Sequence, residues 1–208
     1  MGASVAAAIG GQDGAEGPAL AAILYEAGEG EAADRLLTAV ARELAAGGVR
    51  LAGVVQANEL PLGKCRCDMI VEDLATGART RISEDRGPLA RGCRLDTAAL
   101  HGIVGRIEAA VLAGADLLIL NKFGKSEAAG QGFRAVISAA LEAGIPVLTG
   151  LSRTNLAGWE TFTGGLGVLL PPERDALRAW CRRVLGEPDA MPRPEHCGDA
   201  KQLGLDVA

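Results

Sequence analysis

The stretch Leu117–Arg134, which reads LLILNKFGKSEAAGQGFR, decides the predicted fold. Its four apolar residues, 117–120, are typical of a buried strand, and a helical pattern begins at Ser126. Between them lies the polar segment NKFGK, residues 121–125. In an open parallel sheet, a strand that ends in this way delivers polar side chains to the crevice at its carboxyl end, where ligands bind. Two lysines in this segment therefore predict an anionic ligand.

Strand and helix patterns alternate along most of the chain, which is typical of an α/β protein. Short apolar runs predict buried strands over 21–25, 51–55, 116–120, 145–149 and 168–170. Helical spacing of apolar residues predicts helices over 33–44, 97–112, 126–143, 156–162 and 171–185. Because helices connect these strands through right-handed crossovers, we expect the strands to lie parallel in one sheet.

The middle of the chain departs from this alternation. Residues 66–72 and 79–83 flank a turn that contains Gly77, which predicts an inserted β-hairpin. A loop over 84–94 follows, and Asp96 is placed to cap the next helix. We expect a single domain over 19–186, with a flexible leader at 1–18 and a poorly packed tail at 187–208 that is rich in proline and charge.

The composition excludes several classes of protein. A net charge of −5 argues against non-specific nucleic-acid binding, which depends on clustered lysine and arginine. No apolar run reaches the roughly 18–20 residues that span a bilayer, so no membrane partner is expected. The first residues lack the basic start and long apolar core of a signal peptide. Five cysteines, an odd number, suit a reducing cytoplasm better than a disulfide scaffold.

The turn after the first predicted strand is one candidate site. Its position between strand and helix matches that of a phosphate-binding loop, where backbone N–H groups and a helix N-terminus hold the anion. A working loop of that class ends in G-K-[ST], whereas Gly30 is followed here by Glu31 and Ala32. The turn, with Gly28, Gly30 and Glu31, is therefore either a residual anion or metal–nucleotide site or an ordinary acidic turn that stabilises its helix.

The segment 121–125 is the second candidate site. Asn121 takes the position at which a nucleotide hydrolase of this architecture carries a magnesium-binding Asp, and Lys122 replaces the acidic residue that would position water. The sequence therefore does not predict hydrolysis. The candidate residues for binding a phosphate, an oxyanion or a partner carboxylate are Asn121, Lys122, Gly124, Lys125, Glu127 and Arg134. The alternative is a set of solvated lysines with a weak Lys125–Glu127 surface pair.

Thiol chemistry is the third possibility. Cys65 and Cys67 form a C-x-C pair in the predicted hairpin, and Cys93 precedes a predicted helix between two arginines, which favours a lowered thiol pKa. Cys67 and Cys93 are thus candidates for a soft-metal or redox role, although buried structural cysteines are the more ordinary explanation. His101 lies in a predicted helix and has no evident partner for catalysis.

Five segments together resemble a known bacterial family of unknown function: GVVQ at 53–56, CDM at 67–69, RGCRLD at 91–96, NKFGKSEAAGQGFR at 121–134 and PVLTG at 146–150. That family is similar to small P-loop nucleoside triphosphatases, and its genes often lie beside molybdate-transport genes. The resemblance implies a P-loop NTPase-like three-layer α/β sandwich in a cytoplasmic protein with a link to molybdenum homeostasis. It does not imply hydrolysis, because the residues discussed above depart from the hydrolase pattern.

Three hypotheses follow for the function. The first is a catalytically degenerate P-loop relative that binds a small anionic ligand, a nucleotide or molybdate, in the crevice between residues 28–31 and 121–125. The second is a protein that handles a metal or an oxyanion through Cys67 and Cys93. The third is a non-catalytic interaction protein. The sequence leaves the ligand and any assembly into homo-oligomers open.

Overall fold

The computed structural model describes residues 19–59, 68–84 and 94–186. The predicted leader and tail lie outside these residues. So do Cys65, Cys67 and Cys93, which the thiol hypothesis needs.

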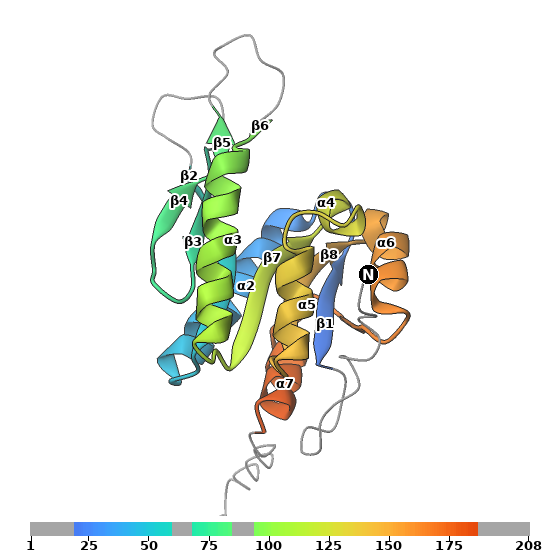
Figure 1. The fold of residues 1–208 in the computed structure, drawn as a ribbon. Helices are drawn as coiled ribbons and strands as arrows, with labels where there is room; N and C mark the ends of the chain where they lie inside the picture. The colour runs from blue at the N-terminus through green and yellow to red at the C-terminus, as the bar shows by residue number, and fades with distance from the viewer. Residues whose placement is uncertain (1–18, 60–67, 85–93, 187–208) are drawn as a thin grey trace, which may run out of the picture.

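Five parallel strands make up most of a seven-stranded sheet in the described part of the chain (Figure 1). In spatial order they are β2 (Leu51–Glu59), β7 (Leu117–Phe123), β8 (Val147–Ser152), β1 (Leu20–Tyr25) and β9 (Val168–Leu170). The predicted parallel α/β sheet is confirmed. β1 and β2 are parallel, but β8 and β7 lie between them.

The inserted hairpin is also present, with a small extension that the sequence did not predict. β3 (Asp68–Asp73) and β4 (Arg79–Arg81) continue the sheet in antiparallel orientation beyond β2. β5 (Ser83–Glu84) and β6 (Arg94–Leu95) then form a separate two-stranded sheet at the ends of the predicted loop.

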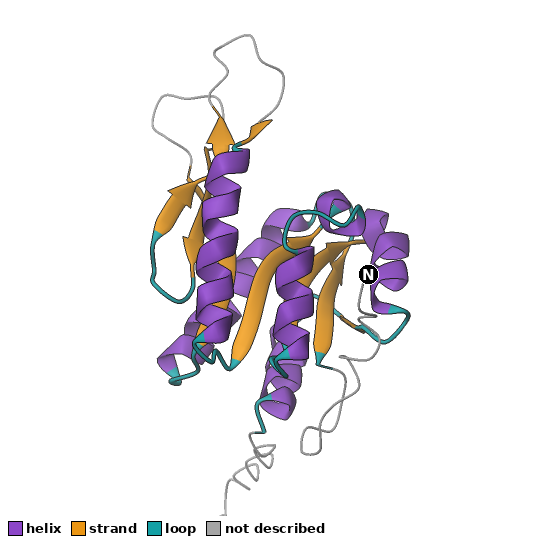
Figure 2. Ribbon diagram, viewed as in Figure 1, coloured by secondary structure: helices purple, strands orange, loops and turns teal. Residues whose placement is uncertain are grey.

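Helices cover both faces of the sheet, which gives three layers (Figure 2). α2 (Gly30–Ala46) and α7 (Arg174–Val184) pack on one face. The opposite face carries α3 (Thr97–Leu112), α5 (Arg134–Glu142) and α6 (Leu156–Thr163). Asp96 caps α3, as predicted, by accepting a hydrogen bond from the Ala99 N–H at 3.0 Å.

The strand side chains alternate between two apolar clusters. In β1, Leu20 and Ala22 face α3, α5 and α6, whereas Ala21 and Ile23 face α2 and α7. This follows from the two-residue period of a strand, and it explains why the strands of a sheet covered on both faces are apolar at nearly every position.

The structure corrects two predicted elements around the opening stretch. The helix predicted over 126–143 is two helices, α4 (Lys125–Ala128) and α5, because Gly130 and Gly132 between them adopt the left-handed φ values of +84° and +61°. The strand predicted over 116–120 continues as β7 to Phe123, so residues 121–123 belong to the sheet and not to the turn after it.

No helix in the described residues is long and apolar enough to cross a membrane.

Candidate functional site

The carboxyl ends of β1 and β8 form the topological switch point of the sheet. The two strands are neighbours, with Tyr25 opposite Ser152 at their last positions. The chain leaves β1 into α2 on one face and leaves β8 toward α6 on the other. Adjacent strands whose connections depart to opposite faces leave a crevice between them, and ligands of open α/β sheets bind there.

The turn between β1 and α2 uses its own acidic residues to satisfy its backbone. The Glu26 N–H donates to Glu29 Oε2 at 3.0 Å, and the Glu29 N–H donates to the Glu26 carbonyl at 3.1 Å. Gly28 adopts a φ of +98°, and α2 begins at Gly30. Glu31 is exposed and pairs with Arg35 one helical turn further on, at 2.6 Å. The Glu29 carboxylate therefore already accepts a hydrogen bond from one backbone N–H of this turn, that of Glu26.

A β-bulge shapes the end of β7. Leu120 is opposite Thr149 of β8, but Phe123 is opposite Leu151, so β7 has one more residue than β8 over this step. The β8 backbone approaches the bulge closely, because a Cβ added at Gly150 would lie 2.7 Å from the Asn121 carbonyl oxygen. Bulges redirect side chains and are common beside active sites.

The bulge gives Asn121 and Lys122 different surroundings. Asn121 is 7% exposed, and its Nδ2 donates to Gln56 Oε1 at 2.8 Å while its Oδ1 accepts from the Gln56 N–H at 3.1 Å. This pair ties the carboxyl ends of β2 and β7 together. Lys122 is exposed, although its neighbours in β7 are buried.

An acidic residue that the sequence analysis missed completes this region. Burial raises the pKa of the Asp34 carboxyl in α2, while the charge of Lys122 and a hydrogen bond from Asn121 act in the opposite direction. Burial also raises the pKa of the Tyr25 hydroxyl, and the charge of Asp34 adds to this effect. The interactions that cause these shifts show that Tyr25, Asp34, Asn121 and Lys122 lie close together at the carboxyl edge of the sheet. Clusters of this kind are frequent at functional sites.

Arg153 joins the two sides of the switch point. It is the first residue after β8, in the short helix η1 (Arg153–Asn155), and its Nε donates to Glu26 Oε1 at 2.5 Å. Ser152 and Thr154 flank it in the chain, and their hydroxyls are hydrogen-bonded to each other at 3.0 Å. The rule that singled out the segment after β7, polar residues following a buried strand, also applies to Arg153 after β8 and Gln56 after Val55, and would have found both.

The other predicted residues of the segment have structural contacts. Glu127 is 7% exposed, and its carboxylate accepts hydrogen bonds from the Gly124 N–H at 2.9 Å and the Phe133 N–H at 3.1 Å. The Arg134 guanidinium lies 4.8 Å from the centre of the Phe162 ring in α6. Lys125 is exposed at the start of α4.

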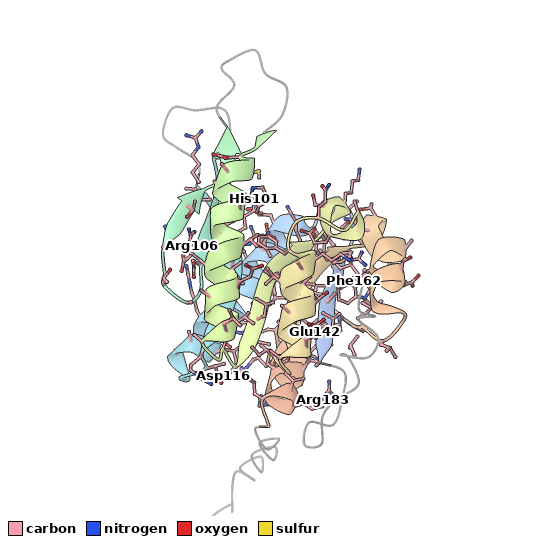
Figure 3. The ribbon with its side chains drawn as sticks, in the orientation of Figure 1. His101, Arg106, Asp116, Glu142, Phe162 and Arg183 are labelled. Atoms are coloured by element: carbon pink, nitrogen blue, oxygen red, sulfur yellow. The ribbon has the colours of Figure 1, made fainter. Side chains whose placement is uncertain are left out.

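A hollow of about 980 Å³ lies at the opposite, amino end of the sheet. Its walls include the C-terminal ends of α2, α3, α5 and α7, whose free carbonyl groups make it unfavourable for an anion. Arg50, in its wall, is already bound to Asp116 at 2.5 Å. Figure 3 shows Asp116 and Arg183 at this end and Phe162 closer to the other. The anion site predicted from the sequence belongs to the carboxyl end.

The metal hypothesis gains no support from the described residues. They contain no group of three histidine, cysteine or acidic side chains that could hold a metal ion. Cys67 and Cys93 are outside them, and Cys181, a residue of α7, is buried in the core. His101 is exposed in the first half of α3 (Figure 3).

Comparison with known proteins identifies the family. A family described as "Protein of unknown function (DUF2478)" matches residues 20–180, which is nearly the whole described domain. The chain belongs to this family. The match begins at the first residue of β1 and ends within α7, so the matched part of this chain contains both strands of the switch point and the bulge of β7.

One curated relative is the "Molybdenum import ATP-binding protein ModC 2" of Bradyrhizobium diazoefficiens, which is 39% identical over 163 residues. The match covers 78% of this chain but 18% of that protein, so the chain spans about a fifth of its length. No solved structure matches the chain.

Proposed function

We propose that this DUF2478 protein binds a nucleotide or an oxyanion in the crevice at the carboxyl ends of β1, β7 and β8, and that it is a P-loop NTPase-like protein without hydrolytic activity. The observation that carries the proposal is the bulge of β7, which presents Lys122 to solvent at this edge while Asn121 beside it is buried and hydrogen-bonded. A fixed polar residue next to an exposed cation, beside the switch point, suits an anionic ligand.

Two further features support this assignment. The β1–α2 turn leads directly into the N-terminus of α2, whose first N–H groups favour a negative charge. The relative from Bradyrhizobium is named as an ATP-binding protein of molybdenum import, which makes ATP and molybdate the first ligands to test. A role in molybdenum homeostasis is part of the proposal.

The proposal excludes hydrolysis for a chemical reason. Phosphoryl transfer by P-loop enzymes needs a lysine and a hydroxyl at the start of the helix and an acidic ligand for magnesium. Here Glu31 follows Gly30, and it is paired with Arg35. Asn121 bonds to Gln56 in place of a metal-binding carboxylate. Binding without turnover is what these side chains support.

Titration calorimetry with ATP, ADP and sodium molybdate tests the proposal. At least one of the three should bind the wild-type protein, and Lys122→Ala should weaken that ligand at least tenfold. Arg183→Ala is the matched control, because it removes one exposed cation at the opposite end of the molecule and should leave the affinity unchanged. Phosphate release from ATP should not exceed that of the buffer.

Any of three results would reject the proposal. The first is that none of the three anions binds the wild-type protein. The second is that Lys122→Ala binds as tightly as the Arg183→Ala control. The third is phosphate release from ATP above that of the buffer.

A further inference from the structure

Arg153 holds a carboxylate at the place where a ligand of this fold is expected. Its Nε donates to Glu26 Oε1 at 2.5 Å, and this bond spans 127 positions in the chain, from the end of β8 to the turn after β1. Both side chains are more than half exposed, at 55% and 57%. The pair therefore bridges the two strand ends at the switch point, and both of its side chains are accessible to solvent and to a dissolved ligand.

We propose that Arg153 binds the anionic group of the ligand and that Glu26 occupies Arg153 when no ligand is present. This inference rests on the proposed function. The group is a tetrahedral oxyanion, either free molybdate or a phosphate of a nucleotide. Guanidinium groups bind carboxylates and phosphates through the same charge-assisted N–H···O bonds, so a side chain placed to hold one can hold the other.

The neighbours of Arg153 suit an oxyanion. Ser152 and Thr154 flank Arg153 in the chain, and their hydroxyls are hydrogen-bonded to each other at 3.0 Å, so the hydroxyl that accepts in this pair keeps its own proton free to donate to an anion. Tyr25 lies opposite Ser152 in the sheet register, so the turn that holds Glu26 borders the same space. An oxyanion at Arg153 would displace the Glu26 carboxylate into water.

The ion pair can open because exposed pairs hold weakly. Arg134 differs from Arg153, because its guanidinium lies against the Phe162 ring. Arg35 also differs, because its partner Glu31 belongs to the same helix and their pairing bridges no crevice. Among these three arginines, Arg153 alone bonds to a residue on the other side of the switch point.

Opposite effects of two substitutions test this competition. Arg153→Ala should weaken the ligand at least tenfold in calorimetry, because it removes the receptor. Glu26→Ala should strengthen the same ligand about threefold or more, because it removes the competitor. Glu160→Ala, which removes one exposed carboxylate from α6, is the matched control for net charge and should change the affinity less than Glu26→Ala does.

Molybdate and ADP, titrated separately into each variant, distinguish the two sources of the oxyanion. If Arg153→Ala binds like wild type while Lys122→Ala does not, the inference is wrong and the proposed function stands. The inference is also wrong, and the proposed function again stands, if Glu26→Ala weakens binding or has the same affinity as the Glu160→Ala control. If no anion binds the wild-type protein, both the inference and the proposed function are wrong.

Discussion

The carboxyl group of Asp34 in α2 lies close enough to Lys122 in β7 for the lysine charge to lower its pKa, but burial has the larger, opposite effect and raises it. Asp34 also receives a hydrogen bond from Asn121, while Glu31 raises its pKa further. The net effect of its surroundings is to disfavour the charged form of this carboxyl relative to water. An acidic residue whose charged form is disfavoured in this way, beside an exposed lysine, is typical of a functional site.

We predict that Asp34→Asn stabilises the protein at pH 7. An acid whose pKa is raised on folding contributes stability below its unfolded pKa, near 3.9, and loses that contribution as the pH rises through the folded value. Asparagine resembles the protonated acid, so the variant keeps this contribution to the folding stability at neutral pH. The midpoint of thermal unfolding should rise by about 1–3 °C at pH 7, and the difference from wild type should vanish near pH 3.

Asp175→Asn is the control for this experiment, because Asp175 is an exposed acid in the first turn of α7. Its loss should give no gain at pH 7, since acidic residues stabilise a helix N-terminus. An Asp34→Asn protein that melts below wild type at pH 7 would contradict the prediction.

Glu127 is predicted to be a structural residue whose two carboxylate oxygens are both needed. They accept hydrogen bonds from the backbone of Gly124 and Phe133, which fixes the loop between α4 and α5. In Glu127→Gln, one oxygen becomes an NH₂ group that faces a part-buried N–H. We expect a loss of about 1–3 kcal/mol in the free energy of unfolding, measured with urea.

Glu142→Gln provides the comparison, because Glu142 is exposed at the end of α5 (Figure 3). It should change the stability by no more than about 0.5 kcal/mol. Equal stability of the two variants would show that the Glu127 contacts contribute nothing, and would return Glu127 to the list of candidate ligand-binding residues.

Much of the fold could be predicted from the sequence, because apolar runs and helical spacing are local signals. The strands predicted at 21–25, 51–55 and 168–170 lie within or coincide with β1, β2 and β9. The β7 bulge could not be predicted, because it depends on the register between β7 and β8. The split of the helix over 126–143 was missed because its cause, Gly130 and Gly132, was interpreted as helical.

The candidate site could be predicted only in part, because some of its contacts join segments that are far apart in the chain. The segment after β7 was found from its lysines, which are visible in the chain itself. Asp34 was missed because it lies on a helix, and its proximity to Lys122 results from packing across the sheet. Arg153 and Glu26 are 127 positions apart, so their pairing could not be read from spacing.

Arg134 gives a prediction that separates packing from binding. Its guanidinium lies over the Phe162 ring, a contact worth about 0.5–1 kcal/mol at an exposed site and more when desolvated. Arg134→Ala should therefore lower the free energy of unfolding by at least this amount while leaving the affinity for ATP, ADP or molybdate within twofold of wild type. Arg134→Lys keeps the charge and loses the stacked plane, so it should recover part of the stability. A tenfold loss of affinity in Arg134→Ala would instead place Arg134 in the binding site.

Among the glycines of the described residues, Gly53 in β2 is predicted to be the least able to accept a side chain. Its φ is +109°, and a Cβ there would lie 1.9 Å from the carbonyl oxygen of Ile119 in β7. Strand β2 would have to leave β7 to make room, which would break the pairing that places Gln56 beside Asn121. Gly53→Ala should therefore fail to accumulate as a folded protein, judged by circular dichroism and gel filtration.

Gly105→Ala is the matched control, since a Cβ at Gly105 in α3 would meet nothing within 4 Å. In a helix interior this substitution should stabilise the protein by about 0.5–1 kcal/mol, because alanine loses less conformational entropy on folding. A well-folded Gly53→Ala protein would mean that β2 and β7 can separate without loss of the sheet. The Asn121–Gln56 pair would then not be held by strand pairing, and the buried half of the proposed anion site would lose its structural basis.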